Sequence, residues 1–222
     1  MDNSERKREL IVKGTGEVSI PPDLLIIEMN LSVMKLKYEE AMDCGATQID
    51  TLRAAIVSAG HEGDALKTGS FSIDTRYRHK DNDYKKKRIF CGYVCSHNLT
   101  LEFDIDMTIL GETLYAIANC EANPSFSIRF SVKDKNKVLD QLLENAVEDS
   151  KRKAQVLAKA AGVRIGAIQR IVFDWSEIAL YSDTDADYGV ACCMDLSAAR
   201  SINIKPKDID VGDTATIIWE IE

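Results

Sequence analysis

The stretch from Leu142 to Ile171 constrains the fold most strongly, because it predicts a long amphipathic helix, a glycine stop and a strand. Apolar or small residues recur there at spacings of three and four, which keeps them on one helical face. They are Leu139, Leu143, Ala146, Ser150, Ala154, Leu157 and Ala161. This face is rich in alanine, so we expect its packing partner to approach closely. Gly162 follows, where a left-handed C-cap favours a residue without Cβ, and Ile168 to Phe173 then predicts a strand.

The composition is that of a globular protein. With 222 residues, 45% of them hydrophobic and 29% charged, the chain is long enough for one large domain or two small ones. Its formal net charge of −8 argues against general nucleic-acid binding. No apolar run approaches the roughly 20 residues of a membrane span, and residues 1–10 lack the apolar segment of a secretory signal. We therefore expect a cytoplasmic protein without a transmembrane segment.

The cysteines favour a reduced protein. The six are Cys44, Cys91, Cys95, Cys120, Cys192 and Cys193. Most of them lie within apolar patterns, as small buried hydrophobic residues do. Cys91 and Cys95 lie on one predicted strand, about 13 Å apart along it, which is too far for a disulfide. Since no C-x-x-C pair is present, a reduced cytosolic protein is the simplest interpretation.

The rest of the chain alternates between strand and helix patterns. Strands are predicted at 10–20, 24–33, 65–77, 89–103, 125–132, 168–173 and 214–221, and helices at 38–59, 107–121 and 135–161. Asp106 and Asp134 are the expected N-caps of the last two helices. The short segment Pro21–Asp23 joins the first two strands, which we expect to form a hairpin. The third and fourth strands are expected to form a second hairpin around the polar tip His79–Lys87.

This order predicts an α+β fold. Along the chain it is ββαββαβαβ, then an irregular segment at 176–208, then a C-terminal strand. Short turns between consecutive strands imply antiparallel pairing, so we expect largely antiparallel sheets packed against two to three helices. The expected organisation is a flexible tail at 1–8 and a single domain at 9–222.

Four segments together carry a family resemblance. Gly14–Asp23 resembles the opening motif of the SIMPL-domain family, and Thr68–Ile73 resembles one of its strands. Gly92-Tyr93, followed by Asn98 to Leu101, is similar to the next strand of that family. The helix Ala146–Gly162, with Gly166 after it, resembles the family's alanine-rich block. The matches run in the family's order from about residue 11 to 173.

The resemblance implies a bacterial protein of unknown function. Many family members carry a signal peptide and are extracytoplasmic, some are associated with protection against oxidative stress, and some are immunogenic. Some assemble into ring-like or channel-like homo-oligomers. The family has no established enzymatic activity, so the resemblance implies no catalytic residue. This sequence departs from the pattern in showing no signal peptide and in its cysteine-containing segment at 176–208.

Two motifs with chemical potential have ordinary structural explanations. Gly14-x-Gly16 suggests a phosphate loop, but such a turn must lead into a helix N-terminus. Here it lies in a strand and leads to Pro21, so a bulge or a close strand approach explains it better. His97 lies on the apolar side of its strand, which favours a buried, hydrogen-bonded histidine over a metal ligand or a catalytic base.

The irregular segment holds the remaining candidates for metal or redox chemistry. Asp183–Asp187 alternates carboxylates like the start of a calcium loop, but Met194 stands at the twelfth position, where a bidentate Glu is expected. A solvated acidic loop is the default interpretation. Cys192 and Cys193 are redox candidates if exposed, although an inert pair is the simpler interpretation. We expect no catalytic, cofactor-binding or metal-binding residue.

The second predicted hairpin concentrates positive charge on an acidic protein. Its candidate interaction residues are Arg76, Arg78, Lys80, Lys85, Lys86, Lys87 and Arg88. One interpretation is a solvated arm. The other is an arm that docks onto an acidic patch of a neighbouring subunit, onto anionic lipid or onto nucleic acid.

The leading hypothesis is a non-enzymatic protein that acts by self-association or by binding a protein partner. No set of acid, base, nucleophile or metal ligands converges in the sequence, and edge strands with a charged hairpin suit subunit contact. We expect a homo-oligomer and no nucleic-acid partner. The alternative is a thiol- or metal-linked stress protein that uses Cys192, Cys193 or the Asp183–Asp187 loop.

Overall fold

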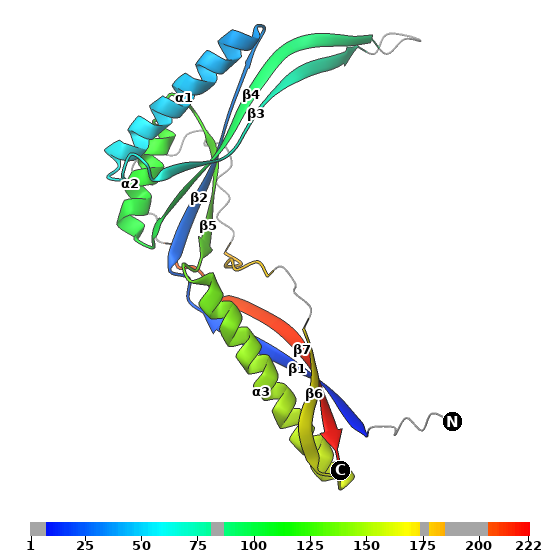
Figure 1. The fold of residues 1–222 in the computed structure, drawn as a ribbon. Coiled ribbons are helices and arrows are strands. Elements are labelled where there is room, and N and C mark those ends of the chain that lie inside the picture. The colour runs from blue at the N-terminus through cyan, green and yellow to red at the C-terminus, as the bar shows by residue number, and fades with distance from the viewer. Residues whose placement is uncertain (1–7, 81–86, 174–177, 185–203) are drawn as a thin grey trace. The chain divides into compact units, whose positions relative to one another are not determined.

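The computed structural model describes residues 8–80, 87–173, 178–184 and 204–222 (Figure 1). Its strands are β1 (Glu9–Ile20), β2 (Leu24–Lys35), β3 (Leu66–Lys80), β4 (Lys87–Asp104), β5 (Ser125–Ser131), β6 (Ile165–Phe173) and β7 (Ile209–Ile221). Its helices are α1 (Tyr38–Ser58), α2 (Met107–Ala118) and α3 (Lys135–Ala161). The predicted α+β class and the order ββαββαβαβ with a C-terminal strand are confirmed.

The strands form two antiparallel sheets, with orders β1-β7-β6 and β3-β4-β2-β5. Contacts within the chain divide it into two compact units that follow these sheets. The first unit contains β1, α3, β6 and β7, and the second contains β2 to β5 with α1 and α2. None of the described helices combines the length and the hydropathy that a transmembrane span requires.

The predicted hairpin of the first two strands is wrong. β1 pairs with β7 over its whole length, from Glu9 opposite Glu220 to Ile20 opposite Ile209. β2 pairs instead with β4 and β5 in the other sheet. The two prolines between β1 and β2 lack N–H donors and have a fixed φ, which disfavours the hydrogen-bonded tight turn that such a hairpin needs. The second predicted hairpin is confirmed, since β3 pairs with β4 from Leu66 opposite Leu101 to Lys80 opposite Lys87.

The core of the second unit lies between its sheet and its two helices. Alternate residues of the central strand β2, from Leu25 to Leu31, are almost completely buried, as the alternation predicts. They pack with Leu52 and Ile56 of α1 and with residues of α2. Asp106 caps α2 as predicted, because its carboxylate accepts hydrogen bonds from the N–H groups of Thr108 and Ile109.

The buried stripe of α3 is shifted from the predicted one. Its fully buried residues are Val138, Leu142, Ala146, Ser150, Ala154 and Ala158, which follow a strict spacing of four. Of the predicted stripe, Leu139 and Leu143 are only half-buried, and Leu157 is 48% exposed. The shift places small residues on the strand side, where the helix lies directly on the backbone of β1. Both predicted ends of the helix are confirmed: Asp134 caps the N-terminus, and Gly162 adopts the left-handed conformation with φ 71°.

Candidate interaction surface

The two glycines of the Gly14-x-Gly16 motif are the contact points of β1 with α3. A Cβ atom at Gly14 would lie 1.9 Å from the carbonyl oxygen of Ala146. One at Gly16 would lie 1.9 Å from that of Leu142. The predicted close approach is confirmed, although the partner is a helix and not a strand. Since α3 occupies the face of both glycines, this motif is not a phosphate loop.

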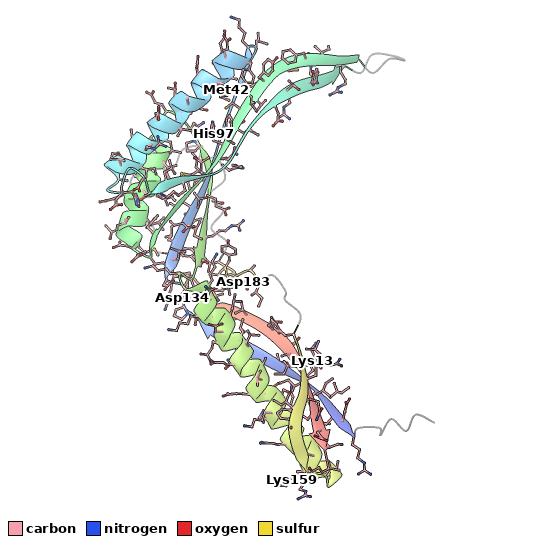
Figure 2. All side chains as sticks on the ribbon, in the orientation of Figure 1. Lys13, Met42, His97, Asp134, Lys159 and Asp183 are labelled. Atoms are coloured by element: carbon pink, nitrogen blue, oxygen red, sulfur yellow. The ribbon has the colours of Figure 1, made fainter. Side chains whose placement is uncertain are left out.

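Side chains of α3 also bind the edge of β1 that faces away from β7. The amide of Asn145 donates to the carbonyl of Glu17 at 2.9 Å, and the ammonium of Lys153 donates to that of Lys13 at 3.2 Å (Figure 2 labels Lys13). Between them, the N–H of Thr15 donates to the carboxylate of Asp149 at 2.9 Å. The three helical residues follow one another at intervals of four positions, and the three strand residues at intervals of two. Each helical side chain therefore reaches one strand residue in turn. Charged and polar side chains thus cover a strand edge that would otherwise be open to another chain.

Asp149 is the electrostatic centre of this seam. Its carboxylate accepts a hydrogen bond from Lys153 at 2.6 Å, and it also binds the Thr15 N–H and the Arg152 guanidinium. These contacts, with Lys153 the largest, hold the pKa of Asp149 far below its usual range. Folding therefore favours the ionised carboxylate.

We expect the Asp149 contacts to make unfolding acid-dependent. Above the unfolded-state pKa of about 3.9 the stabilisation is fully present, and it is lost as the pH falls toward the lower folded-state pKa. Asp149→Asn removes the linkage, so its urea midpoint should fall less than that of the wild type between pH 6 and pH 3. Glu148→Gln, at the exposed neighbouring carboxylate, is the matched control and should keep the wild-type pH dependence. An equal pH dependence in Asp149→Asn would contradict this assignment.

His97 on β4 is buried and hydrogen-bonded, as predicted (Figure 2). Its Nε2 lies 3.5 Å from the Sγ of Cys95, and its ring packs on Phe71 with centroids 4.6 Å apart. Gly45 of α1 lies over the pair, because a Cβ there would be 2.6 Å from the Cys95 sulfur. Burial lowers the pKa of His97 and raises the pKa of Cys95. Both groups are therefore held neutral, the opposite of an activated thiolate paired with an imidazolium.

His61 has a partner that sequence reasoning missed. Its Nε2 lies 2.6 Å from the hydroxyl of Thr113 on α2. That hydroxyl donates to the carbonyl of Ile109, so it accepts from the Nε2–H of the histidine. The His61 ring packs on Phe103 with centroids 4.8 Å apart, and burial lowers the pKa of His61. The histidine therefore joins the end of α1 to α2 in its neutral form.

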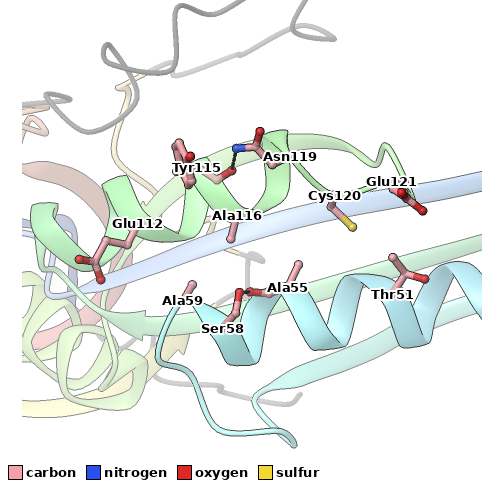
Figure 3. Close-up of a pocket in the computed structure, with 10 residues that line it drawn as sticks. All are labelled: Thr51, Ala55, Ser58, Ala59, Glu112, Tyr115, Ala116, Asn119, Cys120 and Glu121. Atoms are coloured by element: carbon pink, nitrogen blue, oxygen red, sulfur yellow. Dashed lines mark hydrogen bonds between the residues drawn. The ribbon is translucent and has the colours of Figure 1, made fainter.

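A groove of about 560 Å³ lies between α1 and α2 (Figure 3). Small residues of α1, such as Ala55 and Ser58, face residues of α2 across it. Two of the polar groups drawn there are turned back to their own helices: the Ser58 hydroxyl donates to the Ala55 carbonyl, and the Asn119 amide donates to that of Tyr115. The groove thus separates two packed helices and does not aim these donors at a ligand.

β3 is one of the two edge strands of the second sheet. Among the described residues it pairs only with β4, while α1 packs on β2 and β4. Figure 1 shows β3 and β4 continuing together as a ribbon away from α1 and α2. Residues 67–72 of β3 are all exposed, as are Asp74 to Arg78. This strand therefore presents a long backbone edge, in contrast to the covered edge of β1.

A row of aromatic side chains lies along one face of this ribbon. Tyr38 contacts Tyr93 with ring centroids 5.7 Å apart, Tyr93 contacts Phe90 at 5.3 Å, and Phe90 contacts Tyr77 at 5.8 Å. The guanidinium of Arg88 lies over the Tyr77 ring at 4.6 Å. Tyr38, Tyr77 and Phe90 remain 40% to 48% exposed. We call these four rings the aromatic row.

A β-bulge makes the aromatic row possible. Phe90 and Tyr93 are three positions apart, so a regular strand would place them on opposite faces. The register of β3 with β4 shifts between Arg76 and Tyr77, at Gly92, which has φ 143°. The extra residue in β4 returns Phe90 to the face of Tyr93. Sequence analysis identified Gly92-Tyr93 as a family motif but missed this consequence.

The predicted basic residues are only partly described. Arg76, Arg78 and Arg88 are exposed on the ribbon, and Lys80 and Lys87 end its strands. Other predicted residues lie outside the described part of the chain: Lys85, Lys86, Asp185, Asp187, Cys192 and Cys193. Asp183 is described and is exposed. Within the described ranges, no three His, Cys, Asp or Glu residues are grouped to hold a metal ion.

Comparison with known proteins gives a family match over nearly the whole chain. The model of the family described as "SIMPL: Protein of unknown function (DUF541)" matches residues 10–219. The chain is also similar to the 26 kDa periplasmic immunogenic proteins of Brucella melitensis biotype 1 and Brucella abortus strain S19. Each is 26% identical over 164 residues, which is 73% of this chain and 65% of the relative, so the match spans slightly less than two thirds of these relatives. Because the family model covers both units, the chain belongs to the SIMPL family.

Proposed function

We propose that this protein acts without catalysing a reaction, by self-association, and that the outer edge of β3 with the aromatic row is its contact surface. The observation that carries the proposal is the difference between two edge strands. The edge of β1 is covered by Asn145, Asp149 and Lys153, whereas the 15-residue strand β3 is exposed at residues 67–72 and 74–78. A strand edge of this kind adds another strand through backbone hydrogen bonds.

The aromatic row adds apolar area that a second chain can bury, which backbone hydrogen bonds alone do not provide. Exposed tyrosine and phenylalanine rings bury a large apolar area with few rotatable bonds, and such residues are enriched in protein interfaces. Arg88, stacked on Tyr77, keeps a positive charge beside them. The contact surface is therefore apolar along one face of the ribbon and basic around it, on a chain of net charge −8. Because a strand edge and exposed rings can each meet their own copies, a second copy of this chain is the partner that this surface favours.

The role in stress protection and the cellular location of this protein stay proposals. The resemblance implies a role in stress protection, which assembly of many copies would serve without a reaction. The names of the Brucella relatives place those proteins in the periplasm. The cytoplasmic location expected from the N-terminus and the cysteines stays a prediction for this chain.

The test is the mass of the protein in solution. We expect light scattering coupled to gel filtration to give a mass above the 24.7 kDa of one chain. Tyr77→Ala combined with Phe90→Ala should shift the protein toward the monomer, because both truncated rings are exposed and the core stays intact. Val156→Ala, at a 61% exposed residue of α3, is the control and should keep the wild-type mass. A wild-type protein that stays monomeric at high concentration would overturn the proposal.

A further inference from the structure

We infer that β3 pairs antiparallel with β3 of a second copy about a two-fold axis at Thr75, which places Asp74 of each copy opposite Arg76 of the other. The inference rests on the proposed self-association and names its geometry.

Symmetry restricts the pairing to a few registers. A two-fold axis perpendicular to the sheet keeps each face of the sheet on the same side. In antiparallel pairing, directly opposite residues share a face, so residues of even number must meet even ones and odd must meet odd. The axis therefore passes through a residue that meets its own copy. For each choice of that residue, every other pair along the strand is determined.

The charges of β3 select one of these registers. Asp74, Arg76 and Arg78 lie on one face of the strand, and all three are exposed. An axis at residue 74 would oppose two aspartates. An axis at 76 would oppose Asp74 to Arg78 twice but would also oppose two copies of Arg76, and an axis at 77 would oppose Arg76 to Arg78 twice. An axis at Thr75 opposes Asp74 to Arg76 twice and creates no like-charge pair. Opposite charges directly across a strand pair stabilise it, and like charges destabilise it.

The other face of the strand fits the same register. With the axis at Thr75, the half-buried Ile73 of one copy meets Tyr77 of the other, and this happens twice. The Tyr77 ring is 40% exposed and ends the aromatic row, so the apolar rows of the two copies become continuous. The register shift between Thr68 and Ser70 ends regular pairing on one side of the axis. The paired segment then runs from about Ser70 to Lys80, with Thr75 at its centre.

Charge reversal tests the register directly. Asp74→Arg alone and Arg76→Asp alone each replace two attractive pairs by two repulsive ones, so each should raise the dissociation constant by roughly tenfold or more. The double variant Asp74→Arg with Arg76→Asp restores both pairs in reversed order and should return the dissociation constant to near the wild-type value. Asp74 and Arg76 are both exposed, so we expect the substitutions to leave folding unaffected, and circular dichroism checks this. Single variants that associate as well as the wild type, or a double variant as weak as the singles, would overturn the inference.

A cysteine at the axis gives an independent test. Thr75→Cys should form an intermolecular disulfide under mild oxidation, because residues at the axis have Cα atoms about 4.5 to 5.5 Å apart, within disulfide range. Ser72→Cys is the control: its two copies would lie six positions apart, about 20 Å, and should cross-link no more than the wild type. Equal cross-linking of both variants would overturn the register. A wild-type protein that does not associate would instead refute the proposed function, so the two failures are distinguishable.

Discussion

Gly16→Val is expected to abolish the packing of α3 on β1 and to unfold the first unit. A Cβ atom at this position would lie 1.9 Å from the carbonyl oxygen of Leu142 and 2.9 Å from the backbone nitrogen of Ala146. Both contacts are with helix backbone, which cannot rotate away as a side chain would. The helix would have to move by more than an ångström, which would also break the three hydrogen bonds that cover the edge of β1. We expect a loss of at least about 4 kcal/mol in the free energy of unfolding.

Urea unfolding followed by circular dichroism measures this effect. Gly14→Val should lower the free energy of unfolding in the same way, because its Cβ would lie 1.9 Å from the carbonyl oxygen of Ala146. Gly63→Ala is the matched control, since the nearest atom to its new Cβ is a side-chain carbon of Val57 at 3.9 Å. It should change the free energy of unfolding by less than about 1 kcal/mol. A Gly16→Val protein with wild-type stability would show that α3 does not lie on β1 as described.

Gly92→Ala is expected to give the second largest effect, and to affect association as well as stability. Gly92 has φ 143°, a conformation that residues with a Cβ rarely adopt, and the new Cβ would lie 2.5 Å from the carbonyl oxygen of Lys35. Strain and overlap together should cost about 2 to 4 kcal/mol. Relief of the strain would require loss of the bulge, which turns Phe90 away from the face of Tyr93 and breaks the aromatic row.

Two measurements separate these consequences. Thermal unfolding reports the loss of stability, and the solution mass below the unfolding temperature reports association. Gly69→Ala is the control on the adjoining strand, because its nearest neighbour would be the Asn98 carbonyl oxygen at an ordinary 3.7 Å. We expect Gly92→Ala to be less stable and more monomeric, and Gly69→Ala to match the wild type in both. If Gly92→Ala lost stability but kept its oligomeric mass, the aromatic row would not be part of the contact surface.

Local patterns were sufficient to predict the helices, the strands and several of their ends. Alternation located β2 and β4, and capping residues located the ends of α2 and α3, because these features depend on neighbours in the chain. The stripe of α3 was predicted less well. Leu139, Leu143 and Leu157 are among the larger apolar residues of this helix, yet its closest contacts with β1 use Leu142, Ala146 and Ser150. Which helical face is buried depends on the shape of the opposing strand, and here that strand offers glycines.

The candidate surface was predicted only in part. The excess of arginine and lysine on the second hairpin is visible in the sequence, and Arg76, Arg78 and Arg88 are indeed exposed. The aromatic row was missed, because Tyr38 precedes the ribbon by many residues and because the bulge at Gly92 changes the side of the strand on which Phe90 lies. Likewise, a polar row at Asn145, Asp149 and Lys153 is visible on α3, but its role depends on the strand edge beside it.

The sequence by itself determined where this chain forms strands and helices, where glycine and aspartate end them, and to which family it belongs. Only the tertiary structure decided that β1 pairs with β7 and not with β2, and that the edge of β1 is covered whereas no described strand pairs with the outer edge of β3. The physical reason is the distance along the chain between the residues that interact. Helix ends and alternation arise from residues a few positions apart, whereas strand pairing and edge protection depend on groups from distant parts of the chain that meet only when it has folded.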